Sequence, residues 1–456
     1  MPNSTDHAGR AIGETTVPHP ATPLPAESVA GSALYAIYML AILTAANVLS
    51  YADRYLFSIT IPAIKTEFSA SDSLLGIVAG PGFTMSYLLF TMPLATLADR
   101  WSRRRVLAIS ATLWSAATGF CGLATGMFQL TAARVLVGVG EAGSMPASQS
   151  MISQLFEAGR RSTALGVLGS APYLGLVIGL SGGGAIASAW GWRAAFLIMA
   201  VVGLPIALLI WLTGPKRASA STLPSAAQGR EPAWVTMRRC WAIPSLRLLA
   251  LGTGIFNIYG YAGSIWLPTL LMRSHGMTAA EAGFWLGTCS TIGGVAGSLS
   301  SGAIVDALTK YDARWQLRLP ALCFILAFPV FFLMLTLPAG LSIRLISFDM
   351  PVIGLLLMLG GFLSSVWMGP AFGAVSHLVP SEQRAQATAM LIVIINVVGS
   401  ALGPVIAGMV SDALAVKFGG EALRYSLLSM SLLTVVGGLT YFRASMHYGG
   451  DISRSK

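Results

Sequence analysis

Twelve long apolar stretches constrain the fold of this chain more than any other feature. Each reaches the roughly 18 residues that suggest a membrane-spanning helix, and none shows the alternating period of a barrel strand. Of 456 residues, 55% are hydrophobic and 10% are charged, against about 25% charged in an average soluble protein. Because helices satisfy their own backbone hydrogen bonds in lipid, we expect an all-α membrane protein. The expected spans are 33–62, 75–97, 106–126, 129–152, 162–188, 192–213, 247–272, 282–305, 317–337, 351–377, 385–409 and 425–443.

The chain also repeats itself. The segment 155–160 before the fifth span corresponds to 379–384 before the eleventh, an offset of 224 positions, and an offset of 207 carries Asp99 onto Asp306. We therefore predict two pseudo-symmetric halves of six helices each. The first offset also relates three pairs of glycines, namely Gly175 and Gly399, Gly179 and Gly403, and Gly184 and Gly408. The expected divisions are a disordered tail 1–32, an N-terminal half 33–213, a linker 214–246, a C-terminal half 247–443 and a tail 444–456.

Basic residues gather in the loops on one side of the expected bundle. With both termini in the cytoplasm, most of the 28 Lys and Arg fall on the cytoplasmic side, as the positive-inside rule requires. The formal net charge of +10 therefore lies in short loops without a folded nucleic-acid reader. We expect cytoplasmic termini and no nucleic-acid partner.

Four charged residues fall inside expected spans: Asp53 and Arg54 in the first, Arg134 and Glu141 in the fourth. A charge at bilayer depth costs about 2.5–3.5 kcal/mol on insertion scales, so such residues usually face a cavity and carry function. Helix direction places Asp53 and Arg134 at similar depth, and we expect them to form an ion pair. Glu141 lies two helical turns beyond Arg134 on nearly the same face.

This arrangement predicts proton coupling through Glu141, Asp53 and Arg134. A buried carboxylate that gains or loses an arginine partner as the protein moves can release or load a proton. The alternative is a permanent structural salt bridge, with Glu141 held neutral by hydrogen bonds. Arg54, about 100° around the helix from Asp53, either contacts substrate or reaches the outer interface.

Several motifs resemble the major facilitator superfamily of secondary transporters and, within it, the spinster-like lipid transporters. The superfamily resemblance rests on LADRWSRRR at 97–105, although alanine and serine replace two usual glycines. The spinster-like resemblance rests on YADR at 51–54, RVLVGVGEA at 134–142 followed by Pro146, and GWR at 191–193. The resemblance implies a bacterial homologue in the inner (plasma) membrane that carries an amphipathic lipid.

The loop around Asp99 predicts a latch on the cytoplasmic side. An aspartate at the end of one helix can pair with arginines, or with a helix N-terminus, of the other half and hold one state closed. The alternative is that the arginines only fix topology. The expected latch residues are Asp99, Arg100, Arg103, Arg104, Arg160, Asp306 and Arg384.

Two further groups complete the expected site. The glycines Gly175, Gly179, Gly399 and Gly403 let helix backbones approach closely, either for rocking of the halves or for static packing. Polar and aromatic residues of the second half could line a substrate cavity, although aromatic residues at such spacing also pack or form interfacial belts. These residues are Tyr259, Tyr261, Trp266, Trp367 and Asn396.

The leading interpretation is a secondary active transporter that works by alternating access, is driven by a proton gradient and moves a lysolipid or sphingoid substrate. The alternatives are a proton-coupled symporter of small organic anions and a non-transporting lipid sensor. The four cysteines and five histidines are dispersed, so we expect no enzyme, no cofactor and no metal. The expected partners are protons, substrate and membrane lipids, with the protein a monomer.

Overall fold

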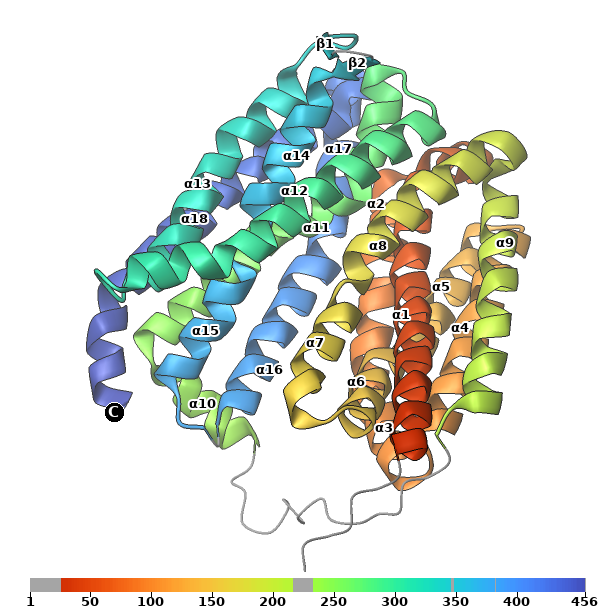
Figure 1. Ribbon diagram of the computed structural model, residues 1–456. Coiled ribbons are helices and arrows are strands. Elements are labelled where there is room, and N and C mark those ends of the chain that lie inside the picture. The colour runs from red at the N-terminus through yellow and green to blue at the C-terminus, as the bar shows by residue number, and fades with distance from the viewer. Residues whose placement is uncertain (1–25, 216–232, 346–347, 382, 456) are drawn as a thin grey trace, which may run out of the picture.

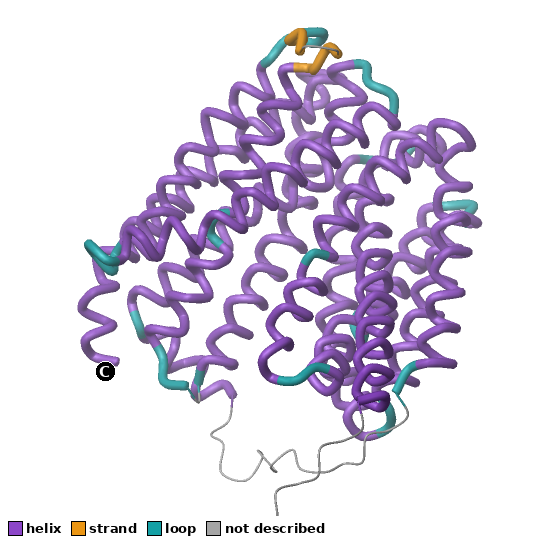
Figure 2. Tube along the Cα trace, viewed as in Figure 1, coloured by secondary structure: helices purple, strands orange, loops and turns teal. Residues whose placement is uncertain are grey.

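The chain folds into long helices that pack side by side, with a short two-stranded hairpin at one end (Figures 1 and 2). The computed structural model describes residues 26–215, 233–345, 348–381 and 383–455. Helices α1 to α9 form one half of the molecule, and α11 to α18 form the other (Figure 1). The all-α architecture in two halves is confirmed.

The first half consists of α1 (Ala26–Phe68), α2 (Asp72–Ile77), η1 (Val78–Gly82), α3 (Phe83–Arg100), α4 (Arg103–Leu123), α5 (Met127–Glu141), α6 (Ser144–Leu155), α7 (Ala158–Gly169), α8 (Ala171–Val177), η2 (Ile178–Gly182) and α9 (Gly183–Thr213). The connection to the second half contains α10 (Ala233–Ala242). The second half consists of α11 (Pro244–His275), α12 (Ala279–Thr309), α13 (Trp315–Thr336), β1 (Ser342–Leu345), β2 (Phe348–Pro351), α14 (Val352–Ser365), α15 (Met368–Leu378), α16 (Arg384–Ile394), η3 (Ile395–Ala401), α17 (Leu402–Phe418), η4 (Gly419–Glu421) and α18 (Ala422–Ser455).

Nine continuous helical stretches of the described chain are long and apolar enough to cross a membrane. Two of them, Gly159–Thr213 with 55 residues and Arg384–Arg454 with 71 residues, are too long for one crossing, which takes about 20 residues. The chain reverses direction at Gly191 (φ 82°) in the shorter of these stretches and at Gly419 (φ 53°) in the longer one. Both glycines have positive φ angles, which suit glycine. Helices α5 and α6 together make another crossing. The structure thus contains the twelve expected spans.

The span limits differ from expectation mainly at the ends of the chain. Helix α1 begins at Ala26, seven positions before the expected limit, and α18 continues to Ser455 rather than ending at 443. The extension of α18 is held by packing and capping, because Tyr448 is buried and Asp451 accepts a hydrogen bond from the Ser245 backbone amide (3.0 Å). Residues 1–25 and 216–232, which hold most of the expected tail and linker, lie outside the described residues.

The bundle has two ends, which we name by what they carry. The hairpin face carries β1 and β2, which pair antiparallel between α13 and α14 and were not expected from the sequence. The linker face carries α10 and the loop between α3 and α4 (Figure 1). The two halves converge toward the hairpin face and diverge toward the linker face (Figure 1).

The sequence repeat is visible in the helix contacts. A Cβ atom on Gly175 would lie 2.4 Å from the Tyr51 side chain, and one on Gly399 would lie 2.8 Å from that of Asn257, so each glycine packs within its own half. Gly184 behaves differently. Its Cβ would lie 2.3 Å from the Ala279 carbonyl oxygen of the other half. Its repeat partner Gly408 also packs across the boundary, where its Cβ would lie 2.3 Å from the Asp72 carbonyl oxygen.

Candidate functional site

A cavity of about 260 Å³ lies between the two halves near the middle of the bundle. Its N-terminal wall combines two arginines with aromatic rings, and its C-terminal wall combines three apolar residues with a tyrosine and two serines. The lining residues are Tyr51, Arg54, Tyr55, Phe57, Ala79, Phe83, Arg134, Pro172, Tyr261, Ser264, Ile265, Met368, Ser400 and Pro404. The aromatic surface therefore comes mainly from the half that carries the charges, and sequence reasoning had assigned it to the other half.

The structure brings Asp53 and Arg134 together as a buried ion pair. Arg134 Nη1 donates to Asp53 Oδ2 (2.6 Å), and the side chains are only 2% and 1% exposed. Thr118 Oγ1 donates to the other carboxylate oxygen (2.8 Å), so both oxygens of Asp53 have a partner. The guanidinium of Arg134 also lies over the Phe57 ring, 4.9 Å from its centroid. Helix α5 thus presents Arg134 to α1 in an almost completely buried contact, although Arg134 also lines the cavity.

Glu141 pairs with Arg54, a contact that the sequence reasoning did not predict. Arg54 donates to Glu141 Oε2 from both Nε (2.8 Å) and Nη2 (2.7 Å), and Ser50 Oγ donates to the same oxygen (2.7 Å). Ser50 and Arg54 are four residues apart on α1 and so lie on one helix face. The spacing of Ser50 and Arg54 in the sequence could have indicated this contact. It places two hydrogen-bond donors of α1 opposite Glu141, the single buried carboxylate of α5.

The two ion pairs differ in access to the cavity. The Arg54 side chain is 26% exposed, whereas its partner Glu141 is completely buried. The Arg54 guanidinium is surrounded by the rings of Tyr51, Phe83 and Tyr87, at 4.6–5.0 Å from their centroids. The Oε1 atom of Glu141 has no hydrogen-bond partner among the described residues. The Arg54–Glu141 pair therefore combines an arginine that the cavity can reach with a buried carboxylate, one oxygen of which has no hydrogen-bond partner among the described residues.

The substrate residues expected in the second half separate into two groups. Tyr261 lines the cavity. Tyr259, Trp266 and Trp367 are buried in the packing of the C-terminal half, where Trp266 donates to the Pro404 carbonyl oxygen (2.9 Å). Asn396 donates to the carbonyl oxygen of Ile392 on its own helix (2.9 Å). None of these last four residues lines the cavity.

The expected latch residues lie on the linker face, but they do not join the halves in this conformation. Asp99 is 59% exposed and accepts a hydrogen bond from Arg103 of its own loop (2.9 Å). Arg104 donates to the Gly214 carbonyl oxygen (3.3 Å), also within the first half. No hydrogen bond or ion pair between the halves is found in the described chain for the other latch residues, Arg100, Arg160, Asp306 and Arg384.

The four glycines assigned to rocking, Gly175, Gly179, Gly399 and Gly403, all pack within a half. A Cβ on Gly179 would lie 2.4 Å from the Ala52 carbonyl oxygen of α1, and one on Gly403 would lie 2.4 Å from that of Ile258 on α11. These glycines therefore set the distance between neighbouring helices of one half. The boundary between the halves uses other glycines, among them Gly184, Gly283 and Gly408.

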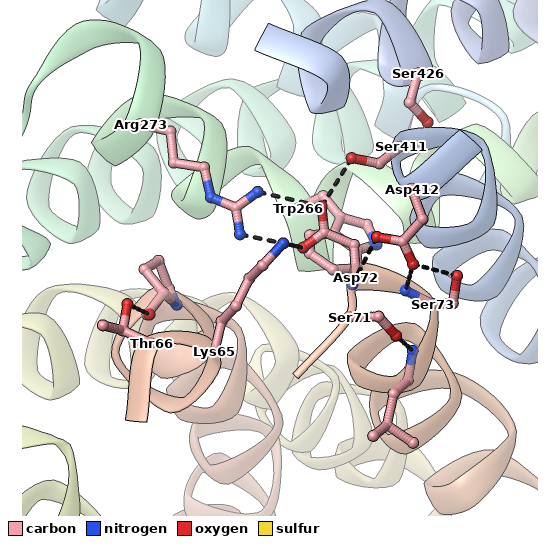
Figure 3. A network of polar contacts seen from close by, with 12 residues as sticks. Lys65, Thr66, Ser71, Asp72, Ser73, Trp266, Arg273, Ser411, Asp412 and Ser426 are labelled. Carbon is pink, nitrogen blue, oxygen red and sulfur yellow. Dashed lines mark hydrogen bonds and ion pairs between the residues drawn. The ribbon is translucent and has the colours of Figure 1, made fainter. Parts of the chain in front are cut away.

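A second cluster of charges, on the hairpin face, was missed. Asp72 at the start of α2 meets Lys65 of α1 and Arg273 of α11, and Asp412 of α17 meets the first backbone amides of α2 (Figure 3). In the sequence these residues lie at span ends, where charges are ordinary. Only the docking of the two halves brings them together, because Asp72 and Asp412 are 340 positions apart.

Two six-helix halves around a charged central cavity define an integral membrane protein with the architecture of a secondary transporter. The sequence matches the model of the Major Facilitator Superfamily over residues 43–404, and the chain belongs to this family. Within the family it is spinster-like. It is therefore a transport protein and not an enzyme.

Similar proteins support this placement. An MFS-type efflux pump of Mycolicibacterium smegmatis is 33% identical over 412 residues, which cover 90% of this chain and 93% of the pump. The sphingosine-1-phosphate transporter SPNS2 of Danio rerio is 26% identical over 90% of this chain and 84% of its own length. A bacterial homologue of the human lysosomal transporter Spinster, solved in an inward-facing and unoccupied conformation, superimposes with a TM-score of 0.78 at 25% identity, over 91% of this chain and 98% of that structure.

Proposed function

We propose that this transporter is proton-coupled and that it moves an amphipathic, lipid-like substrate by alternating access, with Glu141 as the proton carrier. The observation that supports this most is the Arg54–Glu141 pair, in which a buried carboxylate is bound to an arginine that reaches the cavity (2.7 Å). A proton on Glu141 cancels the charge that holds Arg54. Arg54 is then available to the cavity, so proton binding and substrate binding become linked.

The sealed pair has a different role in this proposal. Asp53 and Arg134 are almost completely buried (1% and 2% exposed), although Arg134 forms part of the cavity lining. Breaking such a pair leaves a buried charge without a partner, at a cost of about 3–5 kcal/mol. We assign it to holding α1 against α5, so that Glu141 and Arg54 keep their relative position while the halves move.

The cavity suits an amphiphile. Arg54 supplies one accessible cation for a polar or anionic head group, and Ile265, Met368 and Pro404 supply apolar surface for a chain. The name of the Danio rerio relative, a sphingosine-1-phosphate transporter, agrees with a lipid that carries a charged head. Small organic anions remain the second candidate, because the same arginine would bind a carboxylate.

We further propose that the linker face is cytoplasmic and that the protein works as a monomer in a bacterial inner membrane. The basic loops of residues 100–105 lie on this face, in keeping with the positive-inside rule. On this assignment the conformation described here is open toward the cytoplasm. The proposed Asp99 latch would then form only after the linker face closes.

The test uses purified protein in liposomes, with a pH-sensitive dye inside and three probes outside: sphingosine, a fluorescent lysophosphatidic acid and glucarate. We expect an imposed pH gradient to drive uptake of a lipid probe, and Glu141→Gln to abolish the gradient dependence. Glu281→Gln is the matched control, since Glu281 bonds only to Thr278 in its own helix cap.

Each other outcome has a clear meaning. Uptake of glucarate alone would favour the organic-anion symporter. Saturable binding of a lipid probe, measured by thermal stabilisation, without uptake would favour a sensor. Full gradient dependence in Glu141→Gln would remove Glu141 from the proposal.

A further inference from the structure

The hairpin-face cluster, formed by Lys65, Asp72, Ser73, Arg273, Ser411 and Asp412, joins the two halves through charged side chains (Figure 3). Arg273 donates to both carboxylate oxygens of Asp72 (3.1 and 3.2 Å), and Ser411 Oγ donates to one of them (2.7 Å). Lys65 Nζ lies 2.6 Å from Asp72 Oδ1, and the Asp72 side chain is only 3% exposed. Asp72 is therefore a buried carboxylate with partners from both halves.

Asp412 adds a second connection of a different kind. Its two carboxylate oxygens accept hydrogen bonds from the backbone amides of Asp72 (3.0 Å) and Ser73 (2.8 Å), and the Ser73 hydroxyl also donates to it. These amides begin the continuous helical stretch Asp72–Arg100 and have no partner within it. The free backbone amides at the start of a helix in one half thus donate to a carboxylate of the other half.

Close backbone packing surrounds these contacts. A Cβ on Gly408 would lie 2.3 Å from the Asp72 carbonyl oxygen, and one on Gly76 would lie 2.5 Å from that of Pro404. A cavity of about 580 Å³ borders the cluster and is lined by Lys65, Arg273 and Asp412 among others. Water therefore has a route to these charges when the halves separate.

We propose that the hairpin-face cluster is a gate that holds the halves together on this face. When the gate opens, the cluster residues that stay with each half have no net charge. The N-terminal half contributes one base and one acid, Lys65 and Asp72, and the C-terminal half contributes one of each, Arg273 and Asp412. When the halves part, Lys65 remains with Asp72, because both belong to the first half. Only the contacts of Arg273, Ser411 and Asp412 with the first half are broken.

This division of charge explains how a buried cluster can open. Breaking a buried ion pair is costly mainly because an uncompensated charge stays behind. Here Asp72 keeps a cation, and Arg273 and Asp412 enter water, where separated charges cost little. The gate belongs to the alternating access proposed above, but it requires neither a proton on Glu141 nor any particular substrate.

The gate predicts different effects for the removal of Lys65 and of Arg273, the two cations that pair with Asp72. Arg273→Gln removes a contact between the halves, so we expect the population that is open on the hairpin face to rise about tenfold, the effect of about one charge-assisted hydrogen bond. Lys65→Gln removes the cation that stays with Asp72 after opening, so we expect the open population to fall rather than rise, even though Lys65 is the closer partner. Asp412→Asn should act in the same direction as Arg273→Gln.

Distances between spin labels on the full chain measure these populations, without substrate or proton gradient. Introduced cysteines at Thr66 and Ala415 report on the hairpin face, and a second pair at Gln154 and Ala385 reports on the linker face; all four positions are exposed. The four native cysteines are buried. Opening of the hairpin face should lengthen the first distance and shorten the second.

The outcomes separate the gate from the other possibilities. Equal shifts for Arg273→Gln and Lys65→Gln, or no shift for Arg273→Gln, would overturn the proposal. Arg273→Lys retains the charge and should stay closed, and general misfolding would broaden both distances rather than move them in opposite directions. Because these readouts involve no transport, the gate can fail while Glu141 coupling holds, and the reverse.

Discussion

Arg54 approaches Glu141 through two nitrogen atoms that both bond to the same carboxylate oxygen, at 2.7 and 2.8 Å. The second oxygen of Glu141 stays without a partner in the part of the chain that the structure describes. In this geometry, the charge of Glu141 controls how firmly Arg54 is held in place.

The two residues should therefore behave as one unit in transport. We expect Arg54→Gln and Glu141→Gln each to lower uptake driven by a pH gradient at least about tenfold, since either change removes an interaction worth about 1.5–3 kcal/mol. The double variant should be no worse than the single ones, because the effects of residues in contact do not add. The measurement is a double-mutant cycle of lysophosphatidic acid uptake in liposomes, and strictly additive losses would contradict it.

The sealed pair should matter for stability. Asp53→Asn leaves Arg134 charged and buried, so we expect a loss of about 3–5 kcal/mol in the free energy of unfolding. Asp312→Asn, which breaks a partly exposed pair with Arg318 (2.9 Å) on the linker face, should cost about 0–1 kcal/mol. Thermal unfolding in detergent compares the two variants, and similar losses would argue against a structural role of Asp53.

Tyr259 and Tyr261 offer a direct comparison of packing and binding. Tyr261 lines the cavity, whereas Tyr259 is buried against Phe331, with ring centroids 4.7 Å apart. Tyr261→Ala should weaken stabilisation by a lipid probe several-fold and leave the ligand-free unfolding temperature nearly unchanged. Tyr259→Ala should lower that temperature, because truncating a buried aromatic residue costs about 3–5 kcal/mol. The reverse pattern would show that the cavity is not the binding site.

Neighbouring glycines test the boundary between the halves. Gly184→Ala would place a Cβ 2.3 Å from the Ala279 backbone, whereas nothing lies within 4 Å of a Cβ on Gly182. We expect Gly184→Ala to open the hairpin face in the spin-label distances and Gly182→Ala to leave them unchanged. An identical response of the two variants would mean that this contact does not control the opening.

The proposed latch can be tested on the linker face. Among the described residues Asp99 bonds only to Arg103 within its loop, so Asp99→Asn should leave this conformation nearly unaffected. It should instead reduce the population that is closed on the linker face, by about two- to fivefold for an exposed pair worth up to about 1 kcal/mol. The Gln154 and Ala385 labels measure this change, with Asp312→Asn as the control. No change would mean that the loop serves topology alone.

Much of the architecture could be predicted, because apolar length and charge asymmetry act locally along the chain. The Asp53–Arg134 contact was also predictable, since helix direction sets the depth of each residue. Arg54 was harder, because a rotation of about 100° per residue suggested another helix face. Arg54 in fact shares its face with Ser50, four residues earlier, and Glu141 lies opposite that face.

The remaining contacts depend on how the halves dock. No pattern in the sequence relates Asp72 to Asp412, because each residue looks like an ordinary charge at a span end. The lining of the cavity was mispredicted for a similar reason. Tyr259 and Tyr261 are two positions apart on one helix and point in different directions, so only the packing of α11 decides which of them meets the cavity.

The balanced charges of the hairpin-face cluster have an electrical consequence. The membrane potential acts on a moving charge with about 2.3 kcal/mol per elementary charge for each 100 mV. Each half carries one acid and one base of the cluster, so its opening moves almost no net charge through the field. A voltage dependence of transport would then come from the central site, where a proton on Glu141 changes the charge that crosses the membrane.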